Sequence, residues 1–116
     1  MVMMNADTGA ILGTLPIGMQ NDGVLFNPAT NEALAATGDG HLTVIKQDSP
    51  GHFAVEQTLD TLPGAKTIAL DRKTGHIFVM TVDYGPVPAD APPPVPGRIQ
   101  RGPALPDTFK IIEIGR

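Results

Sequence analysis

The amino-acid sequence predicts an all-β fold built from antiparallel four-stranded sheets. The first observation is an internal repeat: residues 23–37 (GVLFNPATNEALAAT) align without a gap on residues 67–81 (TIALDRKTGHIFVMT), 44 positions later. Each copy is an apolar run, a polar turn that begins with Asn or Asp, and a second apolar run. The second observation is that no segment has a convincing helical period. A period in the forties, with two strands and a tight turn per copy, is typical of β-propeller blades or a similar array.

Nine strands are expected, because nine short apolar or alternating runs are each bounded by Gly, Pro, Asn or Asp. Residues 2–4 and 11–15 flank the turn NADTG, and the repeat pairs flank NPATN and DRKTG. The expected strands are 2–4, 11–15, 23–26, 32–37, 41–46, 53–59, 67–70, 76–82 and 109–114. In order, they supply the last two strands of one blade, all four of a second and three of a third, or about two and a quarter blades. Residues 17–22 are expected to be a loop.

The second half of the repeat is interrupted by a proline-rich insert. Without this insert, LTVIK (42–46) matches FKIIE (109–113). Eight of the twelve prolines lie between Pro86 and Pro106. We therefore expect a single partial domain over 1–116, with strands in 1–84 and 109–115 and a Pro-rich loop at 85–108. Two interpretations of the loop stay open: a lid or recognition arm with Arg98 and Arg101 as charged tips, or a partly disordered solvated loop.

Composition excludes several classes of function. The net charge is −4 and there is no basic stripe, which argues against nucleic-acid binding. There is no Cys, so disulfides, thiolate nucleophiles and Cys-ligated metals are excluded. No apolar run approaches the length of a membrane span, and the opening MVMMNADTG does not have the pattern of a secretory signal. Residues 1–60 hold seven acids and one base, whereas 61–116 hold five acids and seven bases.

The segments NADTGAILGTLPIG (5–18), LFNPATN (25–31), GDGHLTVI (38–45) and PGAKTIALDRKTGHIFVMT (63–81) carry a family resemblance. Their order is similar to that of the YVTN-type (Tyr-Val-Thr-Asn) β-propeller repeat proteins, and the chain resembles the C-terminal third of a seven-bladed propeller. The resemblance implies export to the periplasm for full-length members. The signature tetrapeptide departs from the family, reading FVMT (78–81) and LAAT (34–37). No haem-attachment motif is present, so the resemblance does not imply cytochrome-like chemistry.

A chain that supplies only part of a propeller ring is expected to associate with a partner chain. Two or three blades leave apolar faces exposed, and such faces usually mark an interface. We expect copies of the chain to associate head to tail, with strands near 2–15 of one copy completing the sheet that contains 109–114 of the next. Three copies would supply about 27 strands, close to the about 28 of a seven-bladed ring. Six blades with one strand displaced fit the count equally well.

Candidate ligand-binding residues are the polar groups in the loops expected to share one face: Asp22, Asp39, His41, Lys66, Asp83 and Tyr84. The alternative interpretation is that they are turn formers, above all Asp39 between two glycines. The three histidines, His41, His52 and His76, match no zinc motif, so no metal is expected. His41 beside Asp39 is the pairing best suited to proton transfer, but no nucleophile accompanies it. No catalytic residue and no cofactor are therefore assigned.

The sequence thus predicts a non-catalytic binding or scaffold module of propeller blades that self-associates, with a small molecule or peptide as a further partner. The alternative is a fragment of a larger propeller enzyme or redox-partner protein whose catalytic groups lie outside this chain.

Overall fold

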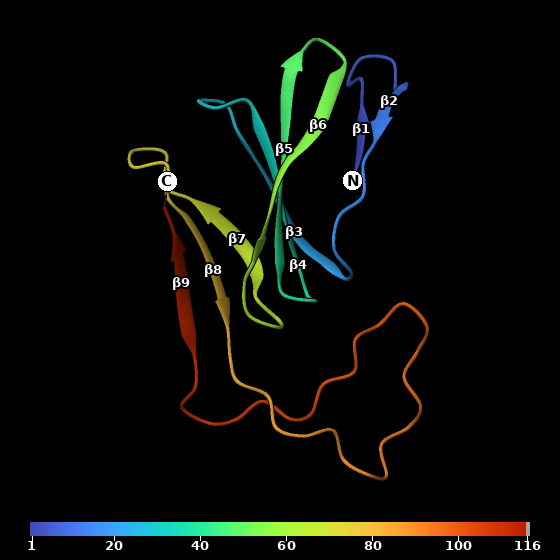
Figure 1. Ribbon diagram of the computed structural model, residues 1–116, viewed down its shortest axis with the longest axis vertical. Coiled ribbons are helices and arrows are strands. Elements are labelled where there is room, and N and C mark those ends of the chain that lie inside the picture. Colours follow the sequence, from blue (N-terminus) through green and yellow to red (C-terminus); the bar gives the residue numbers. More distant parts are fainter. Residues whose placement is uncertain (116) are drawn as a thin grey trace.

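The computed structural model describes residues 1–115, which form nine β-strands and no helix (Figure 1). All nine expected strands are present, so the prediction of an all-β fold is confirmed. The strands are β1 (Val2–Met4), β2 (Ile11–Thr14), β3 (Asn21–Asn27), β4 (Glu32–Thr37), β5 (His41–Ser49), β6 (His52–Asp60), β7 (Lys66–Leu70), β8 (Ile77–Thr81) and β9 (Lys110–Ile114).

The strands form three antiparallel sheets in the expected two, four and three grouping. Their orders are β1-β2, β3-β4-β5-β6 and β7-β8-β9, so within each sheet every strand pairs with the strands next to it in sequence. We call them the first, second and third sheet. One expectation was wrong: Asn21 and Asp22 belong to β3 rather than to a loop, because Asn21 pairs with Thr37 across an irregularity at Asp22. The Pro-rich segment makes a wide excursion below β8 and β9 (Figure 1).

The core lies between the second and third sheets. Leu34, Ala36, Leu42 and Val44 on one sheet pack with Ile77 and Val79 on the other, and Ala65 completes the buried cluster. These side chains share a face because alternate residues of a strand point the same way and because paired residues on adjacent strands lie side by side. The first sheet covers the opposite face of the second sheet at Phe53, where Met3 and Phe53 both approach Gly13.

Strand pairing follows the 44-residue repeat. Leu70 pairs with Ile77 in the third sheet, and Phe26 pairs with Ala33 in the second sheet. Both residues of the first pair lie one repeat length after those of the second pair. The alignment of the last strand needs a correction of two residues. Ile111 pairs with Met80 as Leu42 pairs with Ala36, so Leu42 corresponds to Ile111 and not to Phe109, which precedes β9. A two-residue shift leaves each side chain on the same face of the sheet.

Three hairpin turns have the same local geometry. In two of them the first residue, Asn5 or Asp71, accepts hydrogen bonds from backbone N–H groups inside the turn through Oδ1, and the fifth, Gly9 or Gly75, has a positive φ. In the third, Asn27 plays the first role and Asn31 the last, with φ 60°. Asx side chains and left-handed residues favour such turns, so the N/D-x-x-T-G/N pattern sets the hairpins locally.

Candidate functional site

The loops at one end of the second sheet form a backbone network around Gly38. Its N–H donates to the carbonyl of Gln20 (2.8 Å), and its carbonyl accepts from the N–H of Gly64 (2.9 Å). Gly40 follows with φ 90° and Gly64 has φ 73°, a backbone region that side chains with a Cβ rarely adopt. Gly40 and Gly64 therefore set the turn geometry, and the hydrogen bonds of Gly38 hold three loops together. Asp39 lies between Gly38 and Gly40.

Asp39 is the best-partnered acid in this network. Its carboxylate accepts hydrogen bonds from Thr37 Oγ1 (2.6 Å) and from the backbone N–H of Met19 (2.6 Å). Burial raises the pKa of Asp39, but the Thr37 and Met19 hydrogen bonds and the nearby His41 ring outweigh it, so the pKa lies below its usual value of 3.8. A Cβ on Gly18 would stand 2.2 Å from Thr37 Oγ1 and 2.5 Å from Asp39 Oδ1, so a side chain there would displace these groups. These contacts keep Asp39 ionised.

His41 lies between two carboxylates. Its Nδ1 is 3.1 Å from Asp39 Oδ1 in an electrostatic contact rather than a well-aligned hydrogen bond, and its Nε2 is 3.5 Å from Asp60 Oδ1. Asp39 and His41 line an open cavity of about 330 Å³ whose walls also include Pro16, Ile17, Gly18, Thr43, Val55 and Thr58. Among residues 1–115, no group of three His, Asp or Glu side chains has an arrangement that would hold a metal ion.

Tyr84 belongs to a separate cluster with Arg101. The guanidinium carbon of Arg101 lies 5.3 Å from the centroid of the Tyr84 ring, and Arg101 Nη2 donates to the carbonyl of Gly38. The interpretation of Arg101 as a charged tip of the loop was therefore wrong: it anchors the Pro-rich segment to the glycine network. Tyr84 and Asp83 line a cavity of about 310 Å³ with Leu62, Pro63 and Val82.

The six predicted residues do not form one pocket. Asp39 and His41 line one cavity, while Asp83 and Tyr84 line another, and Asp83 pairs with Lys110 Nζ. Lys66 is exposed at the start of β7, and Asp22 is exposed on β3. The predicted face is thus divided into two small polar sites, joined through the backbone of Gly38.

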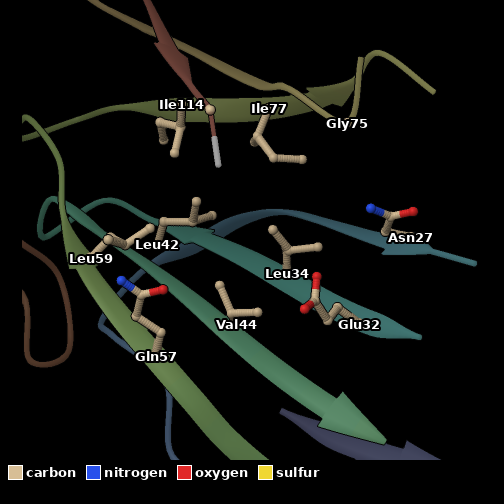
Figure 2. Close-up of a pocket in the computed structure, with 11 residues that line it drawn as sticks. Asn27, Glu32, Leu34, Leu42, Val44, Gln57, Leu59, Gly75, Ile77 and Ile114 are labelled. Carbon is tan, nitrogen blue, oxygen red and sulfur yellow. The ribbon is translucent and has the colours of Figure 1, made fainter. Parts of the chain in front are cut away.

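Sequence reasoning missed a third cavity, which lies between the second and third sheets and is more enclosed than the other two. Figure 2 shows Ile77 and Ile114 facing Leu34, Leu42, Val44 and Leu59 across this cavity. Its volume is about 290 Å³. Its polar lining includes Asn27, Gln57 and Glu32, the last only 1% exposed. Thr30 Oγ1 donates to Glu32 Oε2 (2.6 Å), and Lys46 Nζ lies 3.7 Å from Oε1. An apolar space with a few polar groups is the usual form of a small-molecule site.

The comparisons with known proteins add no family. No protein-family model, no curated protein and no solved structure matches the chain. Within residues 1–115, the structure contains no helix of the length and apolarity that a membrane crossing requires.

Proposed function

We propose that this chain is a non-catalytic binding or scaffold module of propeller-like blades, which associates head to tail with copies of itself. The observation that carries the proposal is the outward face of the third sheet. It presents Phe78, Met80 and Ile111 away from the core, and Phe109, just before β9, is also exposed. Met80 is 41% exposed, Phe109 61% and Ile111 63%.

The repeat supports the proposal that another sheet covers this face. Met80 and Ile111 occupy the positions of Ala36 and Leu42 in the second sheet, which are 2% and 1% exposed because the third sheet packs on them. The same positions in the third sheet are again apolar, yet they face solvent. Large apolar side chains clustered on an exposed sheet face favour association. The proposal therefore places another sheet against β7, β8 and β9.

The opposite end of the stack offers a second apolar surface. Val2, Met4 and Ile11 on the first sheet are between 51% and 66% exposed, and Val24 and Phe26 on β3 are each 51% exposed. A contact between two different apolar ends is heterologous, so copies would either close into a ring or form a filament. The negative charge of residues 1–60 and the positive charge of 61–116 favour the same head-to-tail direction.

The edge of β9 supports the same association. Within residues 1–115, β9 pairs with β8 alone, whereas its counterpart β5 pairs with both β4 and β6. An edge strand exposes backbone N–H and C=O groups that another strand can pair with. The cavity in Figure 2 is bounded by Leu59 and Gln57 of β6 on one sheet and Ile114 on the other. A strand added to β9 would cover its open side.

The test is the mass in solution. Multi-angle light scattering at micromolar concentration should give a mass above that of the 12.2 kDa monomer, with a trimer favoured. The double variant Met80→Asp, Ile111→Asp should be monomeric, because it places charges on the face that is covered. Val87→Asp, a control at an exposed position in the Pro-rich loop, should associate like the wild type. A wild-type monomer would overturn the proposal.

A fragment of a larger propeller enzyme or redox-partner protein is the second candidate. The observation that favours it is the Asp39–His41 pair in its open cavity, which is suited to proton transfer. Loss of a measured hydrolase or quinone-dependent activity in both Asp39→Ala and His41→Ala, with unchanged mass in solution, would support this candidate over the scaffold.

A further inference from the structure

The Pro-rich loop is held at its base but projects freely beyond it. The N–H of Gly85 donates to the carbonyl of Pro103 (2.8 Å), and the N–H of Leu105 donates to the carbonyl of Asp83 (2.9 Å). Arg101 adds its anchor on the glycine network. The two ends of the loop are therefore fixed at one place on the domain, and the segment between them is presented as a unit.

Within this unit, residues 92–96 (PPPVP) are restricted to an extended polyproline-II conformation. Each proline has φ near −65°, and each residue that precedes a proline is pushed away from the helical region. The run ends in a turn in which the N–H of Arg98 donates to the carbonyl of Val95 (2.9 Å) and Gly97 has φ 76°. Proline followed by a left-handed glycine fits a type II turn, whose first central residue keeps a polyproline-II-like backbone. Gln100 Nε2 donates to the carbonyl of Pro92 (3.0 Å) and fixes the other end.

The run is open to a partner. Residues 92–98 are all exposed, and Val95 is 60% exposed. The carbonyl groups of Pro93 and Pro94 accept no hydrogen bond from any residue of 1–115. With three residues per turn, Pro93 and Pro96 lie on the same edge of the helix, about 9 Å apart. Two prolines on one edge, with unused carbonyls between them, match what aromatic-lined grooves bind.

Arg98 adds a charge at one end of this edge. Its guanidinium has no hydrogen-bond or ion-pair partner among residues 1–115. We propose that residues 92–98 are a docking ligand for a protein domain of the SH3 or WW kind, whose aromatic groove takes the prolines and whose acidic rim takes Arg98. This surface is separate from the apolar sheet faces at the two ends of the stack.

The test titrates an isolated SH3 domain with an acidic rim, and separately a WW domain, into the isotope-labelled full chain. At least one of the two should shift the NMR signals of residues 92–98 and leave those of the core strands unchanged. Pro93→Ala with Pro96→Ala should weaken that binding by on the order of tenfold, the loss of about 1.4 kcal/mol. Arg98→Gln should weaken it several-fold and make it less sensitive to salt. The matched control, Pro86→Ala with Pro88→Ala, changes two prolines of the same loop outside the run and should leave affinity unchanged.

Several outcomes would overturn the proposal. One is that neither domain shifts the signals of residues 92–98 at millimolar concentration. Another is that the Pro86 and Pro88 control weakens binding as much as the Pro93 and Pro96 variant. A third is that Arg98→Gln abolishes binding while the proline variant does not, which would indicate non-specific attraction to an acidic surface. The core-strand signals of each variant report separately that the domain is folded.

Discussion

Arg101 lies over the ring of Tyr84, with its guanidinium carbon 5.3 Å from the ring centroid, while its Nη2 reaches the carbonyl of Gly38. Gly38 is 63 positions away in sequence. One side chain therefore joins the Pro-rich loop, Tyr84 just before that loop, and the turn between β4 and β5. The contact makes the loop part of the folded domain rather than an appended spacer.

The first prediction follows from this contact. Arg101→Gln should lower the free energy of unfolding by about 2 kcal/mol, since it removes a charged hydrogen bond and a cation–π contact. Tyr84 is the one tyrosine and the chain has no Trp, so intrinsic fluorescence reports on this ring alone. The variant should change that fluorescence and raise amide exchange in the loop. Arg98→Gln removes the same charge from an arginine without a partner and should change neither. Equal effects of the two variants would contradict the anchoring role.

The strands could be predicted from sequence because their causes are local. Val24 and Phe26 share one face of β3, as Ile68 and Leu70 share one face of β7, and the Asn and Asp turns set each hairpin. The anchor could not be predicted in the same way. An arginine in a Pro-rich loop has no periodic pattern, and its acceptor is a distant backbone carbonyl. That is why Arg101 was expected to be a charged tip of the loop.

The candidate site was harder to predict than the fold. Asp39 and His41 are two residues apart, so their contact follows from a tight turn. Whether Asp83 and Tyr84 share their cavity depends on how the third sheet packs against the second, which no local pattern encodes. The cavity in Figure 2 has the same origin, because it is the space left between two packed sheets.

A second prediction concerns the glycine network. Gly64 has φ 73°, and a Cβ built on it would stand 2.8 Å from Tyr84 Cε2. Gly64→Ala should therefore cost about 1–2 kcal/mol for the backbone and a further amount for displacing the tyrosine ring. Gly51 is a matched control, since its φ is 78° and nothing lies within 4 Å of a Cβ there. Gly51→Ala should show the backbone cost only. Urea denaturation of both variants, followed by Tyr84 fluorescence, measures the difference.

A third prediction tests whether the second and third sheets share one core. Leu42 is 1% exposed and belongs to the apolar cluster between the two sheets. Leu42→Ala should lower the free energy of unfolding by about 2–5 kcal/mol, from lost burial and the cavity left behind. Val87→Ala, at a position 42% exposed in the loop, should stay within about 0.5 kcal/mol of the wild type. Circular dichroism during denaturation measures both. A small cost at Leu42 would mean that the two sheets do not depend on each other.

The last prediction uses the ionisation of Asp39. Its pKa is lowered in the folded protein despite burial, because Thr37 and Met19 donate hydrogen bonds to the carboxylate and His41 lies beside it. A carboxyl group with a lowered folded-state pKa stabilises the fold fully above its unfolded pKa of about 3.9, and that stabilisation is lost as the pH falls through the folded-state value. Asp39→Asn should therefore destabilise the domain by about 1–2 kcal/mol at pH 7, where the charged hydrogen bonds are lost. As the pH falls below about 4, the wild type loses the same charge, so the two denaturation curves should converge.

Asp22→Asn changes an exposed carboxyl with no side-chain partner among residues 1–115 and should leave the unfolding free energy unchanged at both pH values. A difference between wild type and Asp39→Asn that persists undiminished in acid would show that the carboxylate charge is not what stabilises this loop.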